Sequence, residues 1–121
     1  VETAKKFALK TGAVVAVTGK TDIVTDGTKT FLINNGNKMM SSITGTGCQL
    51  SALMTAFAAA NKDDILTACA AAVCTMGLCG EKGAGRMTSL DGNFSYRNYI
   101  IDAVYNLMGD DLERGAKYEV R

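Results

Sequence analysis

A glycine-rich segment directly before a long apolar stretch is the part of this chain best suited to chemistry. Residues 43–48 read Ile-Thr-Gly-Thr-Gly-Cys, and residues 49–60 contain neither Gly nor Pro. This order predicts a flexible turn leading into a helix, whose first unpaired N–H groups and partial positive charge bind anions, most commonly phosphate. Gly45 and Gly47 would let the backbone approach such a ligand closely.

Cys48 adds an ionisable side chain to this segment. Thiols ionise most readily in the first turn of a helix, so a proton acceptor would lie beside the anion site. The chain contains no histidine, which excludes a Ser-His or Cys-His pair built from these residues alone. A nucleophilic cysteine enzyme is therefore the least favoured class. The simpler alternative for the whole segment is a turn that only begins a helix.

Thr18 is the second candidate site residue. Residues 13–18 are apolar and rich in β-branched side chains, which predicts a strand buried on both faces, as in a parallel sheet. Such sheets bind ligands beyond the carboxyl ends of their strands, where Thr18 would lie. The next residues, Gly-Lys-Thr at 19–21, match the end of a P-loop, but Val14 stands where that motif needs glycine. The alternative for Thr18 is a strand-end residue that completes the turn.

Local signals predict the remaining elements. The Asp-Gly pair at 26–27 separates two β-branched runs, residues 22–25 and 30–33, and predicts a hairpin. Helices are predicted over residues 2–11, 46–60, 63–82 and 95–108. The expected caps are Gly12 after the first helix, Asp63 or Asp64 before the third, and Asn93 or Ser95 before the last. The polar residues from Gly109 onward are expected to fray.

Composition and charge narrow the function classes. The 121 residues, 47% of them hydrophobic, suffice for one ordinary domain, and 13 basic against 12 acidic residues argue against a nucleic-acid partner. The apolar run 65–79 is too short to span a membrane. Cys69, Cys74 and Cys79 form no C-x-x-C pair, so we expect small apolar core residues in a reduced, cytoplasmic protein.

Two features predict that the chain is one part of an α/β domain. It begins with Val1 rather than Met, and its first residues resemble the middle of a helix. One buried strand and a hairpin cannot make a complete sheet, so parallel partner strands are missing. We therefore expect residues 1–121 to be the C-terminal portion of a single domain, containing the end of the parallel sheet, a β-hairpin and then helices.

Two segments resemble the hydroxyethylthiazole kinases. Residues 15–27 (VAVTGKTDIVTDG) resemble a strand and turn of that family, and residues 35–48 (NGNKMMSSITGTGC) resemble its anion-hole segment. The resemblance implies a ribokinase-like, three-layer α/β fold, in which related kinases usually carry Asp where Cys48 stands. It also implies that the absent N-terminal half of the kinase domain supplies most of the parallel sheet.

The resemblance further implies ATP-dependent phosphorylation of the hydroxyl of 4-methyl-5-(2-hydroxyethyl)thiazole, for thiamine biosynthesis or salvage. The implied ATP- or phosphate-binding residues are Thr18, Gly45, Thr46 and Gly47. Gly45 would also contact the thiazole, and Cys48 would be catalytic by orienting the hydroxyl or accepting its proton. Mg²⁺ is implied, with acidic residues from the absent half and no metal ligand within these residues, as is a homotrimer with active sites between subunits.

Two alternatives stay open at this point. One is another ribokinase-like kinase, acting on a hydroxymethylpyrimidine, pyridoxal or a sugar, against which the cysteine at position 48 argues. The other is a non-catalytic fragment, because the chain alone lacks histidine and an acidic metal site, and we expect it to be inactive without the rest of the domain.

Overall fold

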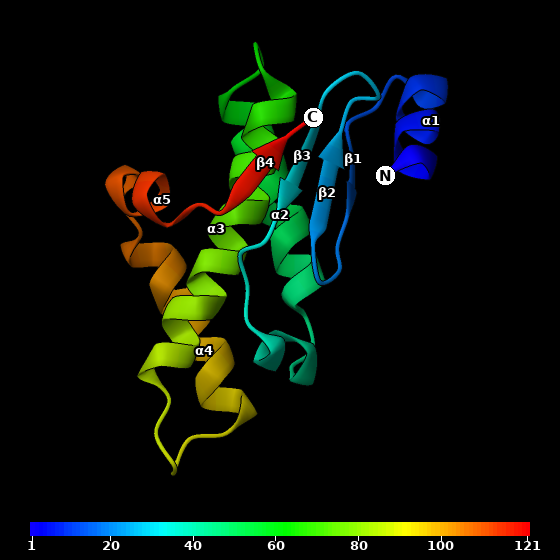
Figure 1. The fold of residues 1–121 in the computed structure, drawn as a ribbon. Coiled ribbons are helices and arrows are strands. Elements are labelled where there is room, and N and C mark those ends of the chain that lie inside the picture. Colours follow the sequence, from blue (N-terminus) through cyan, green and yellow to red (C-terminus); the bar gives the residue numbers. More distant parts are fainter.

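The longest helix, α3 (Ile65–Arg86), is the element on which most others pack. In the computed structural model, which describes residues 1–121, α3 contacts α2 (Thr46–Ala60), α4 (Asn93–Asn106) and α5 (Gly109–Gly115), together with the sheet (Figure 1). The three helices predicted after the glycine-rich segment are all present, with ends within a few residues of those expected. α2 has the predicted bounds.

The helix caps agree with the sequence in one case and differ in another. The carboxylate of Asp64 accepts a hydrogen bond from the Thr67 N–H at 3.1 Å, which confirms the predicted start of α3. The predicted cap of α4 by Asn93 or Ser95 is wrong, because no side chain caps that helix. The Asn93 side-chain amide instead donates to the Ser42 carbonyl at 3.1 Å. Because it bonds to this distant residue, it does not cap the start of α4.

Four short strands form one antiparallel sheet. In sheet order they are β1 (Val15–Val17), β2 (Asp22–Thr25), β3 (Thr30–Ile33) and β4 (Tyr118–Val120). The predicted hairpin between β2 and β3 is confirmed. The Asp26 carboxylate accepts from the Thr28 and Lys29 N–H groups at 2.8 Å each, which closes the turn. The buried hydroxyls of Thr25 and Thr30 bond to each other at 2.9 Å across its base.

The prediction of a parallel strand buried on both faces is wrong for β1 within this chain. β1 pairs only with β2, and the pair is antiparallel. Val17 is 46% exposed, and the other two residues of the strand are half-buried. β1 is the edge strand of this sheet, which is why it has one pairing partner.

The predicted fraying after Gly109 is also wrong. The polar residues there form α5 and β4, and Figure 1 shows this final segment returning along β3. Val120 lies opposite Phe31, and the Asn34 N–H donates to the Lys117 carbonyl at 2.8 Å. Local pattern does not reveal β4, because its pairing partner lies far away in the sequence.

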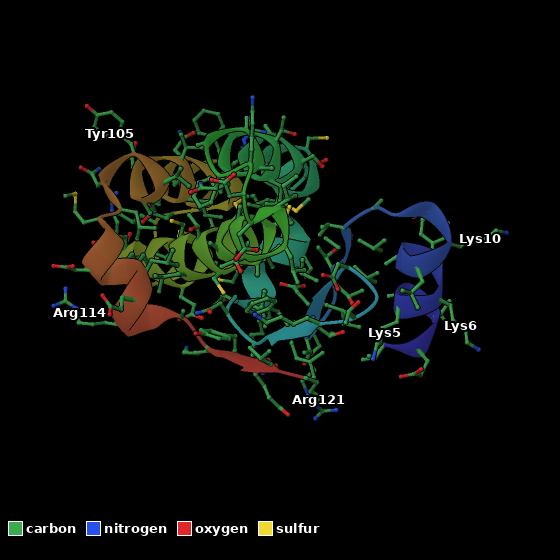
Figure 2. The ribbon with its side chains drawn as sticks, turned by 90° about the horizontal axis from the view of Figure 1, so that it is seen from above. Lys5, Lys6, Lys10, Tyr105, Arg114 and Arg121 are labelled. Atoms are coloured by element: carbon green, nitrogen blue, oxygen red, sulfur yellow. The ribbon has the colours of Figure 1, made fainter.

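The first helix, α1 (Glu2–Thr11), packs beside β1 and β2 and lies at the opposite end of the molecule from α5 (Figures 1 and 2). Its buried residues are Ala4 and Ala8. Gly12 ends the helix at φ 70°, a left-handed conformation that favours glycine, and its N–H donates to the Ala8 carbonyl at 2.8 Å. The predicted cap is confirmed.

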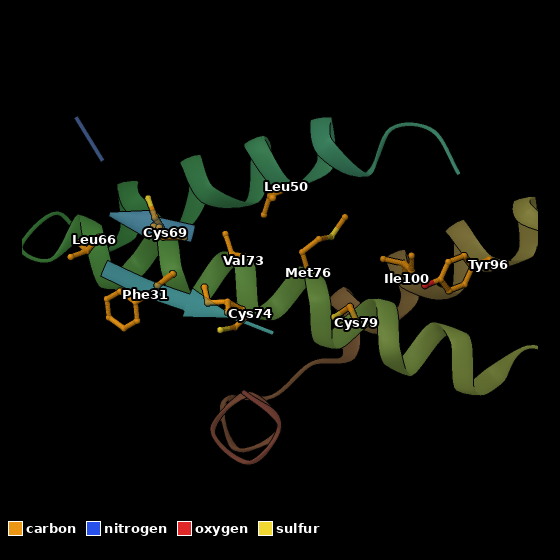
Figure 3. Close-up of a cluster of buried hydrophobic side chains, with 13 residues drawn as sticks. Phe31, Leu50, Leu66, Cys69, Val73, Cys74, Met76, Cys79, Tyr96 and Ile100 are labelled. Carbon is orange, nitrogen blue, oxygen red and sulfur yellow. The ribbon is translucent and has the colours of Figure 1, made fainter. Parts of the chain in front are cut away.

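One cluster of thirteen buried side chains forms the core (Figure 3). Its members are Val24, Phe31, Ile33, Leu50, Leu66, Cys69, Ala70, Val73, Cys74, Met76, Cys79, Tyr96 and Ile100. The three cysteines of α3 are buried free thiols, as the sequence predicted. Burial raises the pKa of Cys74 and of Cys79 to about 11, so both stay protonated at neutral pH.

By length and composition alone, α3 could cross a membrane. However, 72% of its most apolar window is buried inside the protein, against the sheet and the other helices. The central helix of a folded domain has the same apolar composition, because it must be hydrophobic on every side.

Two glycines of α3 let neighbouring segments lie directly on its backbone. A Cβ at Gly77 would come within 2.6 Å of the Asn35 Cβ and 2.7 Å of the Asn35 carbonyl carbon. A Cβ at Gly80 would overlap the thioether of Met40. Because Asn35 presents backbone rather than a flexible side-chain end, only glycine fits at position 77.

We predict that Gly77→Ala destabilises the fold by about 1–3 kcal/mol, because the new methyl group forces the 35–36 backbone away from α3. Gly85→Ala is the matched control in the same helix, since a Cβ there meets nothing within 4 Å. That change should be neutral or stabilising by up to about 1 kcal/mol. Urea unfolding of the complete gene product measures both, and equal stability of the two variants would contradict this packing.

Candidate functional site

The glycine-rich segment forms the N-terminus of α2, as the sequence predicted. Gly45 precedes the helix at φ 95°, in the left-handed conformation, and no side chain caps it. The first helical hydrogen bond runs from the Gln49 N–H to the Gly45 carbonyl at 3.0 Å. The N–H groups of Thr46, Gly47 and Cys48 have no acceptor within the chain. Three free donors at the positive end of a fifteen-residue helix are suited to an anion.

Two of these three residues, Thr46 and Gly47, line a pocket of about 590 Å³. Its lining residues come from four places: the turn after β1, the segment after β3, the start of α2 and the middle of α3. The second of these includes a short 3₁₀ helix, η1 (Lys38–Ser42). Thr18, Thr46 and Gly47 all line this pocket, so the structure brings together three of the residues selected from sequence.

The other two candidates do not line the pocket. Gly45 is half-buried at the turn before α2, and Cys48 lies one residue beyond Gly47 with an exposed, free thiol. The Cys48 side chain makes no hydrogen bond within the chain. Its position in the first turn of α2 is the predicted one, whereas its chemical role stays a prediction.

Three charged residues in the pocket lining were not selected as site residues from the sequence. Lys20 and Lys38 are exposed there, and neither forms an ion pair with the chain. Asp22 is half-buried and accepts the Gly19 N–H at 2.8 Å, which fixes the turn after Thr18. Burial raises the pKa of Asp22, while this hydrogen bond partly opposes the increase. The lysines give the pocket a positive charge that complements a phosphate.

The residues that build the far rim of the pocket were also missed. Asn35 is only 6% exposed, and every polar atom of its side chain is hydrogen-bonded to α3 or to residues 115–117. Its sequence context predicts only a turn. The resemblance of residues 35–48 to the kinase segment is the one signal for this region, since no local pattern predicts a bond to residues so distant along the chain.

Metal ligands are sparse in this chain. No group of three or more His, Cys, Asp or Glu side chains lies close enough to hold a metal ion. Asp22 is the single carboxylate among the pocket residues. The donors present therefore fit a phosphate group but do not make a Mg²⁺ site by themselves.

The model of the hydroxyethylthiazole kinase family matches residues 1–110. The chain belongs to this family. A hydroxyethylthiazole kinase from Clostridium acetobutylicum is 54% identical over 116 residues, which are 96% of this chain and 42% of the relative. One from Arabidopsis thaliana is 43% identical over 107 residues, which are 88% of this chain and 38% of the relative. The resemblance identified from sequence is thereby confirmed.

A solved structure of hydroxyethylthiazole kinase from Pyrococcus horikoshii has the same arrangement of elements. It superposes with a TM-score of 0.87 at 30% identity and covers 98% of this chain and 44% of that structure. The expected α/β, ribokinase-like fold is thus confirmed at the level of the family, with an antiparallel four-stranded sheet and helices in this part. The chain spans about 42% of the length of the C. acetobutylicum relative.

Proposed function

We propose that the complete gene product transfers the γ-phosphoryl group of ATP to the hydroxyl of 4-methyl-5-(2-hydroxyethyl)thiazole, for thiamine biosynthesis or salvage. The observation that carries the proposal is the set of three free N–H groups at the start of α2, in a chain of this family. Two of the three residues, Thr46 and Gly47, line the same pocket as Thr18. The named activity of the similar proteins from C. acetobutylicum and P. horikoshii supports the choice of substrate.

The reaction requires alignment and charge stabilisation more than covalent help from the protein. The hydroxyl oxygen of the thiazole attacks the γ-phosphorus, the bond to the β–γ bridging oxygen breaks, ADP leaves, and the hydroxyl proton is released. In this proposal, the amides of Gly45 through Cys48 stabilise the negative charge on the transferring phosphoryl oxygens. Lys20 and Lys38 attract the phosphates of ATP into the pocket, and Thr18 contacts the nucleotide.

The acceptor side of the site rests on Gly45 and Cys48 in this proposal. Gly45 lies against the thiazole ring, and Cys48 orients the hydroxyl or accepts its proton as the new oxygen–phosphorus bond forms. The exposure of the Cys48 thiol and its place beside the free amides support such a contact. Hydroxyl attack on phosphorus needs no strong base, so Cys48 assists the reaction without being indispensable.

The cofactors and partners follow from the same proposal. ATP is the co-substrate, and its phosphates suit the amides and lysines of the pocket. Mg²⁺ accompanies ATP, but no residue of this chain is assigned to it, because the pocket offers one carboxylate only. We further propose a cytoplasmic homotrimer with active sites between subunits.

We predict that the complete gene product releases ADP from Mg²⁺-ATP only when hydroxyethylthiazole is present, and that Cys48→Ala lowers kcat without abolishing turnover. A coupled ADP assay with both enzymes measures this directly. Unchanged kcat in the variant would show that the Cys48 thiol takes no part in catalysis. If a hydroxymethylpyrimidine, pyridoxal or a sugar gives turnover and the thiazole does not, the substrate assignment fails within the same superfold.

We predict that Gly47→Val lowers kcat/KM for ATP at least tenfold, because the branched side chain stands between the free amides and the phosphates. A Cβ at Gly47 meets nothing within 4 Å and its φ is not positive, so the chain itself accommodates the change. Gly85→Val is the matched control, since position 85 is equally open but lies at the C-terminal end of α3, outside the pocket lining. Normal turnover of Gly47→Val would refute the anion site at α2.

A further inference from the structure

Glu81 of α3 reaches the segment that follows β3 and bonds to its backbone. One carboxylate oxygen, Oε1, accepts the Gly36 N–H at 2.9 Å and the Asn35 Nδ2 at 3.2 Å. The other, Oε2, accepts the Lys117 ammonium at 2.9 Å. A single carboxylate therefore joins α3 to two loops that lie far from it in the sequence.

Asn35 completes this junction from the other side. Its Nδ2 also donates to the Gly115 carbonyl at 2.9 Å, and its Oδ1 accepts the Lys117 N–H at 2.7 Å. The side chain is buried, so loss of any of these partners would leave an amide group without compensation. We call Asn35, Gly36, Glu81 and Lys117 the rim junction.

The charge on Glu81 suits this role. Partial burial raises the pKa of Glu81, but the Gly36 N–H, the Lys117 ammonium and the Asn35 amide together more than offset it, so the pKa lies below its ordinary value. The carboxylate is therefore ionised at neutral pH and makes charge-assisted hydrogen bonds, which are stronger than neutral ones.

The rim junction holds one wall of the pocket. Residues 34–38 all line it, whereas Glu81 and Lys117 do not. The contact of Asn35 with Gly77 prevents the segment from moving toward α3, and Glu81 prevents it from moving away. Lys38 follows Gly36 by two residues. Its position in the pocket lining therefore depends on how the Gly36 backbone is held.

From this geometry we propose that Glu81 is a positioning residue that fixes residues 34–38 as the wall of the ATP pocket and thereby sets the affinity for nucleotide. This inference rests on the proposed function, since it takes the pocket as the ATP site. It predicts an effect of Glu81 on nucleotide binding although the side chain touches no nucleotide.

The test compares Glu81→Ala and Glu81→Gln in the complete gene product. Glu81→Ala should weaken ADP binding about tenfold in calorimetry, since three hydrogen bonds are lost and the wall relaxes. It should raise KM for ATP similarly, with a smaller change in kcat and in KM for the thiazole. Glu81→Gln should restore part of the affinity, because its carboxamide oxygen still accepts the Gly36 N–H.

Asp102→Asn is the control, because Asp102 pairs with Arg86 at 3.4 Å on an exposed surface that contributes nothing to the pocket lining. It should leave ADP affinity unchanged.

A merely structural role of Glu81 would lower the melting temperature of both Glu81 variants while the folded enzyme keeps its ADP affinity. That result would overturn the inference. If wild type binds ADP but does not phosphorylate the thiazole, the proposed substrate fails and the inference stands; if wild type binds no ADP, both fail.

Discussion

The backbone of α3 is the surface on which the rest of this structure depends. Gly77, Gly80 and Gly83 carry no side chain where Asn35, Met40 and Ile100 approach, so these segments lie directly on the helix. The Tyr96 hydroxyl, fully buried on α4, donates to the Gly80 carbonyl at 2.9 Å in the same region. A helix with larger residues at these positions would hold its neighbours too far away to share one core.

This close packing is what connects the fold to the site. The walls of the pocket come from four segments that are separated in the sequence, and two of those that α3 does not itself supply are fixed through it. In the segment 34–38, Asn35 lies against Gly77 and Gly36 bonds to Glu81, while α2 packs along the same helix and places Thr46 and Gly47 at the pocket. An anion site of backbone donors needs this rigidity, because amides stabilise charge only when they are already aimed at it.

The sequence predicted those parts of the fold that local chemistry determines. The Asp-Gly turn, the glycine that ends α1 and the bounds of α2 each follow from a few adjacent residues, and the structure confirms them. It did not predict α5 and β4, since β4 exists through pairing with β3. It overestimated the burial of β1, because a run of Val and Ala indicates a strand but not which of its faces other elements cover.

The same division applies to the site. Thr18, Thr46 and Gly47 could be selected from a strand end and a helix start, and they share a pocket. Residues that act through distant partners left no local signal: the bond between Asn35 and Glu81 spans 46 residues. Lys20 belongs to the Gly-Lys-Thr turn at 19–21, which lacks the first glycine that a P-loop needs. The structure nevertheless places Lys20 at the pocket. The roles of Gly45 and Cys48 stay predictions.

The central claim is that the free amides of Thr46, Gly47 and Cys48 bind the phosphates of ATP. The most direct measurement is a titration of the ¹⁵N-labelled complete gene product with a non-hydrolysable ATP analogue that keeps the γ-phosphoryl group, followed by the amide resonances in two-dimensional NMR. We expect these three signals to move downfield together, with one dissociation constant that equals the value calorimetry gives for the same nucleotide. Saturating binding of the analogue that leaves all three signals unmoved while others shift would contradict the claim.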